Sequence, residues 1–230
     1  MTGPPTGAVD IAIPVNHLGL TKTRLLVPQQ LREHLVIAFL IDTVQAALHS
    51  PAVRTVTVIT DDTAAQQAAR RAGADSFSPQ LPHPGLNRDL TAFANTTCGE
   101  QPLAVLLADL PALKPAELTA ALAECAWHRA AFAADQQQSG TTLLYSERAK
   151  WLRPAFGNRS ARRHHTTGAH PLSNVGPGLR RDVDTLADLI TARALGAGTH
   201  TTAEIHAHPD VLLTHHRQLT DERHTAACPI

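Results

Sequence analysis

The sequence has no excess of charge of either sign, because its 20 Lys and Arg residues equal its 20 Asp and Glu residues. A surface without net positive charge creates no overall field that would draw the protein to DNA, RNA or an anionic membrane. Hydrophobic residues make up 43% of the chain and charged residues 17%, a balance typical of globular proteins. The composition therefore argues against binding to nucleic acid or membranes and predicts a chain that folds without a partner.

The sequence also lacks a long apolar run. No stretch approaches the roughly 20 apolar residues needed to span a bilayer, and residues 1–10 hold no basic segment followed by an apolar one. At 230 residues the chain is within the range of a single domain with a sizeable core. We therefore expect a cytoplasmic, single-domain protein with a flexible N-terminus over residues 1–8.

The sequence also lacks cysteines or histidines with the spacing of a metal-binding motif. Cys98, Cys125 and Cys228 are widely spaced, so neither a zinc site nor a disulfide framework is predicted. The 14 histidines include neighbours such as His164 and His165, and none shows the spacing beside a carboxylate that helical metal motifs use. We expect structural cysteines and surface histidines.

Short apolar runs alternate with amphipathic stretches along the chain. The expected strands cover residues 9–15, 53–60, 103–111, 130–134, 141–145 and 179–183, and the expected helices cover residues 28–49, 63–71, 87–95, 115–127, 160–167 and 185–195. Strands that alternate with long helices predict a mostly parallel sheet with helices on both faces. Such a sheet binds ligands beyond the carboxyl ends of its strands.

The predicted fold class is therefore α/β, a single Rossmann-like domain over residues 9–198. After Gly198 the composition turns to His, Thr and Pro without clear periodicity. We expect residues 199–230 to form a C-terminal tail with at most one short helix.

Two cations follow the first expected strand. The loop over residues 16–25, N-H-L-G-L-T-K-T-R-L, lacks the glycine spacing and the Gly-Lys-Ser/Thr ending of a Walker P-loop. Lys22 and Arg24 nevertheless lie where the sheet opens, just before a helix whose free amides also favour anions. The pair suits a triphosphate; alternatively, both are solvated loop charges.

Three aspartates have the positions of metal ligands. Asp109 follows the most apolar run in the chain, where an unpaired buried carboxylate would be costly. Asp182 and Asp184 are two residues apart on an expected strand and would face the same way. Magnesium prefers oxygen ligands, so the three carboxylates predict a site for it. Alternatively, Asp109 caps a turn, and Asp184 or Thr185 caps the final helix.

Two glycine-containing turns are rich in hydroxyl groups. They are S-G-T-T at residues 139–142 and F-G-N-R-S at residues 156–160, which opens a short helix. Backbone amides and hydroxyls in such turns can hold a phosphate or a carboxylate. Alternatively, they are only turns.

Seven motifs occur in the order that is typical of one family: V-N-H-L-G-L-T-K-T-R-L, L-N at 86–87, A-D-L-P-A-L, A-D at 134–135, G-T-T, F-G-N-R-S-A-R-R-H and G-L-R-R-D-V-D-T. Together they resemble the guanylyltransferases of coenzyme F420 biosynthesis, which act on phosphoenolpyruvate or 2-phospho-L-lactate. The resemblance covers residues 9–196, and its specificity comes from the ordered set. It implies a nucleotidyltransferase fold, a requirement for Mg²⁺, and transfer of GMP from GTP with release of diphosphate.

The resemblance also implies roles for individual residues. Asp109, Asp182 and Asp184 would hold the metal ions, and Lys22 would lie on the GTP phosphates, so that Lys22 and Asp109 are the expected catalytic residues. The expected substrate-binding residues are Arg24, Asn87, Thr142, Gly157 and Ser160. The expected partners are GTP, a small phosphorylated acid and the next transferase of the pathway.

The chain departs from the family pattern at two places. Asn16 stands where the family usually has Lys, and residues 139–142 read Ser-Gly-Thr-Thr where the family usually has Gly-Thr-Gly-Thr. Three alternatives therefore stay open. They are a related enzyme with another acceptor such as 3-phospho-D-glycerate, a sugar-phosphate nucleotidyltransferase on the same scaffold, and a catalytically silent nucleotide-binding paralogue.

Overall fold

One seven-stranded sheet organises the protein. The computed structural model describes residues 8–15, 22–81, 85–97 and 99–209, and in this part of the chain the strand order is β3-β2-β1-β4-β6-β5-β7. The strands are β1 (Val9–Pro14), β2 (Val53–Ile59), β3 (Asp75–Phe77), β4 (Leu103–Leu106), β5 (Ala130–Ala134), β6 (Thr141–Ser146) and β7 (His170–Pro171). All described pairs are parallel except those of β6, which runs antiparallel to β4 and β5. The predicted mostly parallel α/β sheet is confirmed.

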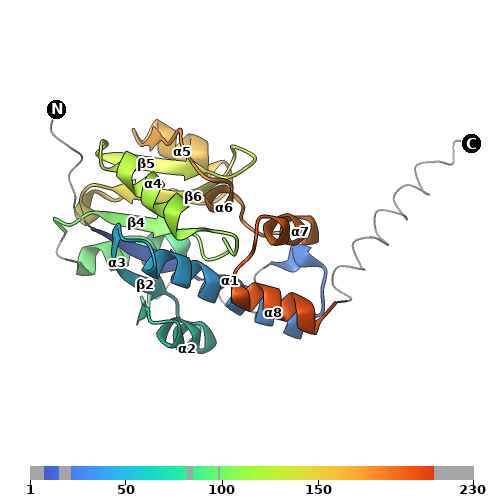
Figure 1. Ribbon diagram of the computed structural model, residues 1–230. Helices are drawn as coiled ribbons and strands as arrows, with labels where there is room; N and C mark the ends of the chain where they lie inside the picture. The colour runs from blue at the N-terminus through green and yellow to red at the C-terminus, as the bar shows by residue number, and fades with distance from the viewer. Residues whose placement is uncertain (1–7, 16–21, 82–84, 98, 210–230) are drawn as a thin grey trace, which may run out of the picture.

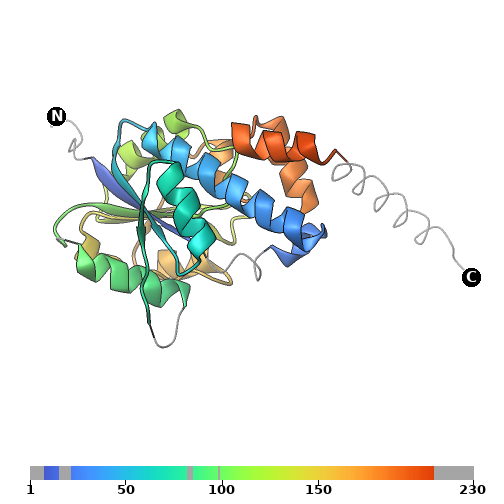
Figure 2. The same cartoon turned by 90° about the horizontal axis from the view of Figure 1, so that it is seen from below.

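Helices cover both faces of the sheet (Figures 1 and 2). They are α1 (Gln29–Leu48), α2 (Thr63–Arg71), α3 (Leu86–Thr96), α4 (Pro115–Cys125), α5 (Ser160–Thr166), α6 (Pro177–Arg180), α7 (Leu186–Ala194) and α8 (Thr199–Ala207), with 3₁₀ turns η2 (Thr23–Leu25) and η3 (Ala149–Trp151). Helices α1, α2 and α4 pack on one face, and α3, η3 and α5 pack on the other. No helix in the described part of the chain has the length and apolarity that crossing a membrane requires.

The central strands are buried on both faces, which explains their nearly continuous apolar sequences. In β1, Ile11 and Ile13 point into the core under α1, whereas Ala12 points into the core under α3. All residues of β4 are buried. Burying one such aliphatic side chain contributes about 1.5–3 kcal/mol, so the sheet is a rigid base for the loops at its edge. Cys125 is buried and free, as a structural cysteine is expected to be.

The six expected helices are present, with ends within two residues of the predicted ones, but the strand expected at residues 179–183 is wrong. That segment begins in helix α6, because Pro177 suits a first helical turn and Glu117 accepts a hydrogen bond from the Gly178 amide at 3.1 Å. The expected strand 103–111 is also too long, because β4 ends at Leu106. Strand β3, only three residues long, is too short to leave a periodic pattern.

Helix α8 lies within the segment that was expected to be a tail, and it packs against α1. The buried carboxylate of Asp42, in α1, accepts hydrogen bonds from the amides of His200 and Thr201 at 3.1 and 2.8 Å. It thereby satisfies amides that the first turn of a helix leaves free. Gly198 contacts this carboxylate so closely that any side chain there would collide with it. Residues 199–207 are therefore part of the packed body, and residues 210–230 lie outside the described residues.

We predict that Asp42→Ala lowers the free energy of unfolding by about 1–3 kcal/mol, because it leaves two amides of α8 without their acceptor. Urea unfolding would measure the loss. Asp75→Ala is the matched control, since Asp75 is exposed in an edge strand and its replacement should change stability by less than about 0.5 kcal/mol. Equal unfolding midpoints for the two variants would show that Asp42 does not hold α8.

Candidate active site

Three aspartates meet beyond the carboxyl end of β4. Asp109 follows that strand by three residues, and Asp182 and Asp184 lie between α6 and α7. One carboxylate oxygen from each lies within 4.8 Å of the others. The Val183 amide donates to the carbonyl oxygen of Asp109 at 3.0 Å, which fixes the two segments side by side. The predicted convergence is observed, although residues 182 and 184 do not lie on the expected strand.

A small apolar cluster lies under these aspartates. Leu25 ends η2, directly after Arg24 and three residues after Lys22. Val183 lies between Asp182 and Asp184. The side chains of Leu25 and Val183 are both completely buried in this cluster. Side chains of α1, α7 and α8 complete it, including Ile205 of α8. The charged groups are therefore placed by buried neighbours in the sequence, not by flexible loops.

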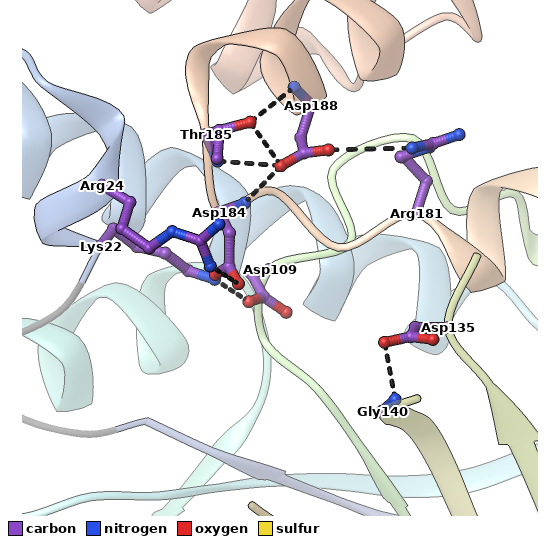
Figure 3. A network of polar contacts seen from close by, with 9 residues as sticks. All are labelled: Lys22, Arg24, Asp109, Asp135, Gly140, Arg181, Asp184, Thr185 and Asp188. Carbon is purple, nitrogen blue, oxygen red and sulfur yellow. Dashed lines mark hydrogen bonds and ion pairs between the residues drawn. The ribbon is translucent and has the colours of Figure 1, made fainter. Parts of the chain in front are cut away.

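Lys22 lies between the carboxylates (Figure 3). Its ammonium group forms ion pairs with Asp109 and Asp184, and its side chain is only 13% exposed. Burial by itself would lower the pKa of Lys22, but the charges of Asp109 and Asp184 raise that pKa above its ordinary value. Lys22 therefore stays protonated and offsets part of the negative charge. Arg24 is farther away, 3.9 Å from an oxygen of Asp184, and its side chain is 74% exposed.

Lys22 does not balance the negative charge completely. Burial raises the pKa of Asp182 to about 7; the charges of Asp109 and Asp184 act in the same direction, and Lys22 opposes them. The Oδ1 atom of Asp109 is buried and has no hydrogen-bond partner among the residues that the structure describes. Hard oxygen donors with excess negative charge are the ligands that Mg²⁺ prefers. These residues therefore fit a magnesium ion.

The segment that carries Asp184 is anchored by a capping box. The Thr185 hydroxyl accepts from the Asp188 amide at 3.2 Å, and the Asp188 carboxylate accepts from the Thr185 amide at 2.9 Å (Figure 3). Arg181 adds an ion pair with Asp188 at 3.7 Å. The alternative that Thr185 caps the helix expected over residues 185–195 is thus correct, and it leaves the carboxylate of Asp184 free to face Lys22.

The first glycine-containing turn is shaped by Asp135, at the end of β5. Its carboxylate accepts hydrogen bonds from the amide of Ser139 at 2.9 Å and from the amide of Gly140 at 2.7 Å. Figure 3 shows the bond to Gly140. A Cβ atom on Gly140 would lie 2.5 Å from an oxygen of Asp135, so only glycine fits there. The Arg180 guanidinium donates to the carbonyl oxygen of Asp135 at 3.0 Å. Asp135 belongs to the A-D motif at residues 134–135, but the motif alone does not show that its carboxylate shapes this turn.

The second turn lies beside the first. The Ala161 amide donates to the carbonyl oxygen of Ser139 at 3.1 Å, which joins the start of α5 to the first turn. Gly157 has a φ of 115°, which favours glycine, and Ser160 is the buried first residue of α5. Thr142 is completely buried, with its hydroxyl 3.5 Å from the carbonyl oxygen of Ala133. The structure therefore brings Gly157 and Ser160, in the second turn and at the start of α5, close to Thr142, which is the second residue of β6 and not part of a turn.

Asn87 holds the second turn from α3. Its amide nitrogen donates to the carbonyl oxygen of Phe156 at 3.1 Å, and its amide oxygen accepts from the Phe156 amide at 2.8 Å. Because both polar atoms bind the backbone of Phe156, the observed contacts of Asn87 shape the site. Asn16, the departure from the family pattern, lies outside the described residues.

The sequence analysis missed His164. The expectation of a surface position is correct for His165, which is exposed, but wrong for His164, which is completely buried. The Nδ1 atom of His164 lies 2.9 Å from the hydroxyl oxygen of Thr141, and its Nε2 atom accepts from the Ala155 amide at 2.9 Å. Neighbouring residues of a helix point in different directions, so a doublet on a short helix signals one buried and one exposed ring.

Comparison with known proteins identifies relatives over most of the chain. A family model described as a MobA-like NTP transferase domain matches residues 29–173. A protein from Geodermatophilus obscurus named phosphoenolpyruvate guanylyltransferase is 47% identical over 203 residues, which cover 85% of this chain and 93% of that protein. A protein of the same name from Mycolicibacterium paratuberculosis is 41% identical over 210 residues, which cover 88% of this chain and 95% of that protein.

The fold also has a counterpart among solved structures. A putative nucleotide-diphospho-sugar transferase from Desulfovibrio desulfuricans superposes with a TM-score of 0.66 and 15% sequence identity, covering 90% of this chain and 98% of that chain. At this identity the likeness concerns the fold alone. It agrees with the predicted nucleotidyltransferase-type α/β architecture.

We predict that Lys22→Met lowers the free energy of unfolding by about 1–3 kcal/mol in the absence of divalent metal, because it leaves Asp109 and Asp184 without their ammonium partner. Mg²⁺ should restore more of the melting temperature in this variant than in the unchanged protein. Arg24→Met is the control, since Arg24 is exposed and its long ion pair should contribute little. Equal responses to Mg²⁺ in both variants would contradict a shared cation position.

We also predict a pH dependence that belongs to Asp182. Because its pKa is raised to about 7, the folded protein holds a proton that the unfolded chain releases above pH about 4. Without divalent metal, the free energy of unfolding should therefore fall between pH about 4 and 7, by up to about 1.4 kcal/mol per pH unit. Asp182→Asn should remove this slope, and Asp75→Asn should keep it. Urea titrations in a metal chelator at several pH values would measure both slopes; identical slopes would refute the assignment.

Proposed function

The chain belongs to the family of MobA-like NTP transferases, and within it to the phosphoenolpyruvate guanylyltransferases; we propose from this membership that it transfers GMP from GTP to phosphoenolpyruvate and releases diphosphate. One observation carries the proposal: relatives of this name match nearly their whole length, at up to 47% identity. The convergence of Asp109, Asp182 and Asp184 at one edge of the sheet supports it, because three carboxylates can hold Mg²⁺, which would supply the positive charge that phosphoryl transfer requires.

The reaction joins two anions. An oxygen of the acceptor phosphate attacks the α-phosphorus of GTP, a new P–O–P bond forms, and the bond from the α-phosphorus to the oxygen that bridges to the β-phosphorus breaks. The electron pair of that bond leaves with diphosphate. The attacking oxygen is already anionic, so the reaction requires no strong general base. Most of the activation barrier comes from bringing two anions together in line. Correct positioning and nearby positive charge lower it.

Asp109, Asp182 and Asp184 would hold Mg²⁺ in this reaction. When bound there, the metal supplies charge neutralisation for the phosphates and for the group in transfer. Lys22, which forms ion pairs with Asp109 and Asp184, contributes a further positive charge at the same edge. Arg24, exposed beside Asp184, has the freedom to turn toward the triphosphate.

The two adjoining turns suit the acceptor. Phosphoenolpyruvate carries a phosphate next to a carboxylate, and both groups need donors within a few ångströms of each other. Residues 139–142 and 156–160 approach this place from two directions, and Asp135 and Asn87 fix their shape by accepting hydrogen bonds from the amides of Gly140 and Phe156. Thr142, Gly157 and Ser160 are the proposed contacts.

Further assignments complete the proposal. The product belongs to coenzyme F420 biosynthesis, the chain acts in the cytoplasm, and the next transferase of that pathway takes the product. The boundaries at residues 8 and 198 remain predictions, and the packing of α8 on α1 favours a domain that extends through residue 207.

We predict that the purified chain releases diphosphate from GTP and Mg²⁺ when phosphoenolpyruvate is added, faster than with 2-phospho-L-lactate or 3-phospho-D-glycerate. Asp109→Asn should reduce the rate by at least about 100-fold, because it removes a carboxylate from the cation site. Diphosphate release and mass spectrometry of the product would measure both effects. Faster release with another acid would identify that acid as the acceptor. If no acid and no nucleotide gave transfer, the result would favour a catalytically silent paralogue.

A further inference from the structure

Two side chains from outside the turn hold residues 155–160 in place. Asn87 forms the paired hydrogen bonds with Phe156, and His164 accepts a hydrogen bond from the Ala155 amide at 2.9 Å. Within the turn, Gly157 and Arg159 both have positive φ values, 115° and 54°, and one backbone hydrogen bond runs from the Ser160 amide to the carbonyl oxygen of Gly157 at 3.1 Å. Its shape therefore depends on these external contacts.

The contacts of His164 define its protonation state. Nε2 receives the Ala155 N–H, so it carries no proton. In a neutral ring the proton is then on Nδ1, which donates to the hydroxyl oxygen of Thr141 at 2.9 Å. Burial, together with the charge of Arg163, lowers the pKa of His164 to about 4, so the ring stays neutral at physiological pH. A neutral imidazole is thus a rigid bridge with one donor and one acceptor, both used.

This bridge connects the second turn to the strand beside the aspartates. Thr141 opens β6, and the carbonyl oxygen of its neighbour Thr142 accepts from the Leu107 amide at 3.0 Å. Leu107 precedes Asp109 by two residues on the same chain segment. The path from Ala155 to Asp109 therefore runs through His164, β6 and the end of β4, all of it buried or hydrogen-bonded.

We infer that His164 is a positioning residue of the acceptor pocket: it sets the distance between the turn of residues 155–160 and β6, and so determines acceptor affinity without touching a substrate. The inference rests on the proposed function, in which Thr142, Gly157 and Ser160 contact the acceptor. Thr142 adjoins the donor side of the bridge, and Gly157 and Ser160 adjoin its acceptor side. The GTP side of the site, at Lys22 and Asp109, has no direct contact with the ring among the described residues.

Packing and hydrogen bonding by His164 can be separated. The ring also packs edge-on against Phe156, at 5.1 Å between centroids, and against Phe132 at 6.1 Å. His164→Leu keeps an apolar group against both rings and removes both hydrogen bonds. His164→Gln retains an amide oxygen that can accept from Ala155. His165→Leu is the matched control, because the same substitution on an exposed neighbour leaves the bridge intact.

The experiment measures steady-state kinetics with each substrate varied in turn. His164→Leu should raise the KM for phosphoenolpyruvate about tenfold and change the KM for GTP less than about twofold, as expected for the loss of a buried hydrogen-bond acceptor. His164→Gln should recover most of this loss, and His165→Leu should match the unchanged protein. Equal increases in both KM values, or a loss in kcat alone, would overturn the inference, as would failure of Gln to improve on Leu.

Amide hydrogen exchange gives a readout that does not need catalysis. In His164→Leu, the amides of residues 155–160 should exchange at least about tenfold faster, with α1 unchanged. If the Leu variant does not fold, Thr141→Val removes the other partner of the ring and should raise the KM for phosphoenolpyruvate about threefold. If the unchanged protein transfers no GMP, the proposed function fails. Amide exchange would still test whether His164 holds the turn, and unaltered exchange in residues 155–160 would overturn that inference.

Discussion

Mutual repulsion of Asp109, Asp182 and Asp184 is the constraint on which the rest of the structure depends. Three carboxylates share one small space, and Lys22 offsets only part of their charge. Such an arrangement costs stability unless the surrounding structure imposes it. The Val183 amide, the capping box of α7 and the small apolar cluster under the site impose it together. The fold thus holds an excess of negative charge that a cation would offset.

The antiparallel strand β6 brings the two candidate parts of the site to the same edge of the sheet. Strand β4 ends beside Asp109, whereas β6 begins at the same edge with Thr141 and Thr142, because it runs in the opposite direction. A parallel neighbour would have placed its beginning at the far side of the sheet. The reversal therefore sets the turn that precedes β6 at the same edge as the aspartates, so that the proposed acceptor side adjoins the proposed nucleotide side.

Much of this was predictable from sequence, and the exceptions have physical reasons. The order of strands and helices follows from apolar periodicity, and the position of Asp109 follows from the rule that parallel strands end at one edge. Asp182 and Asp184 reach the same edge from the segment between α6 and α7, not from a strand. Helix α6 was missed because a single turn carries no periodic signal. The cap that Asp42 gives to α8, and the burial of His164, depend on residues more than 100 and 20 positions away, respectively. Local pattern does not contain such long-range pairings.

The small cluster that includes Leu25, Val183 and Ile205 is separate from the two cores on the faces of the sheet. Side chains next to the charged groups thus share one support with α8, the last described helix of the chain. A fragment that ends at residue 198 would retain the sheet and its main cores but lose Ile205 from this support. A shortened version of the protein must therefore meet two separate requirements: it must fold, and it must keep Lys22 and the three aspartates well ordered. The second requirement sets the minimum length.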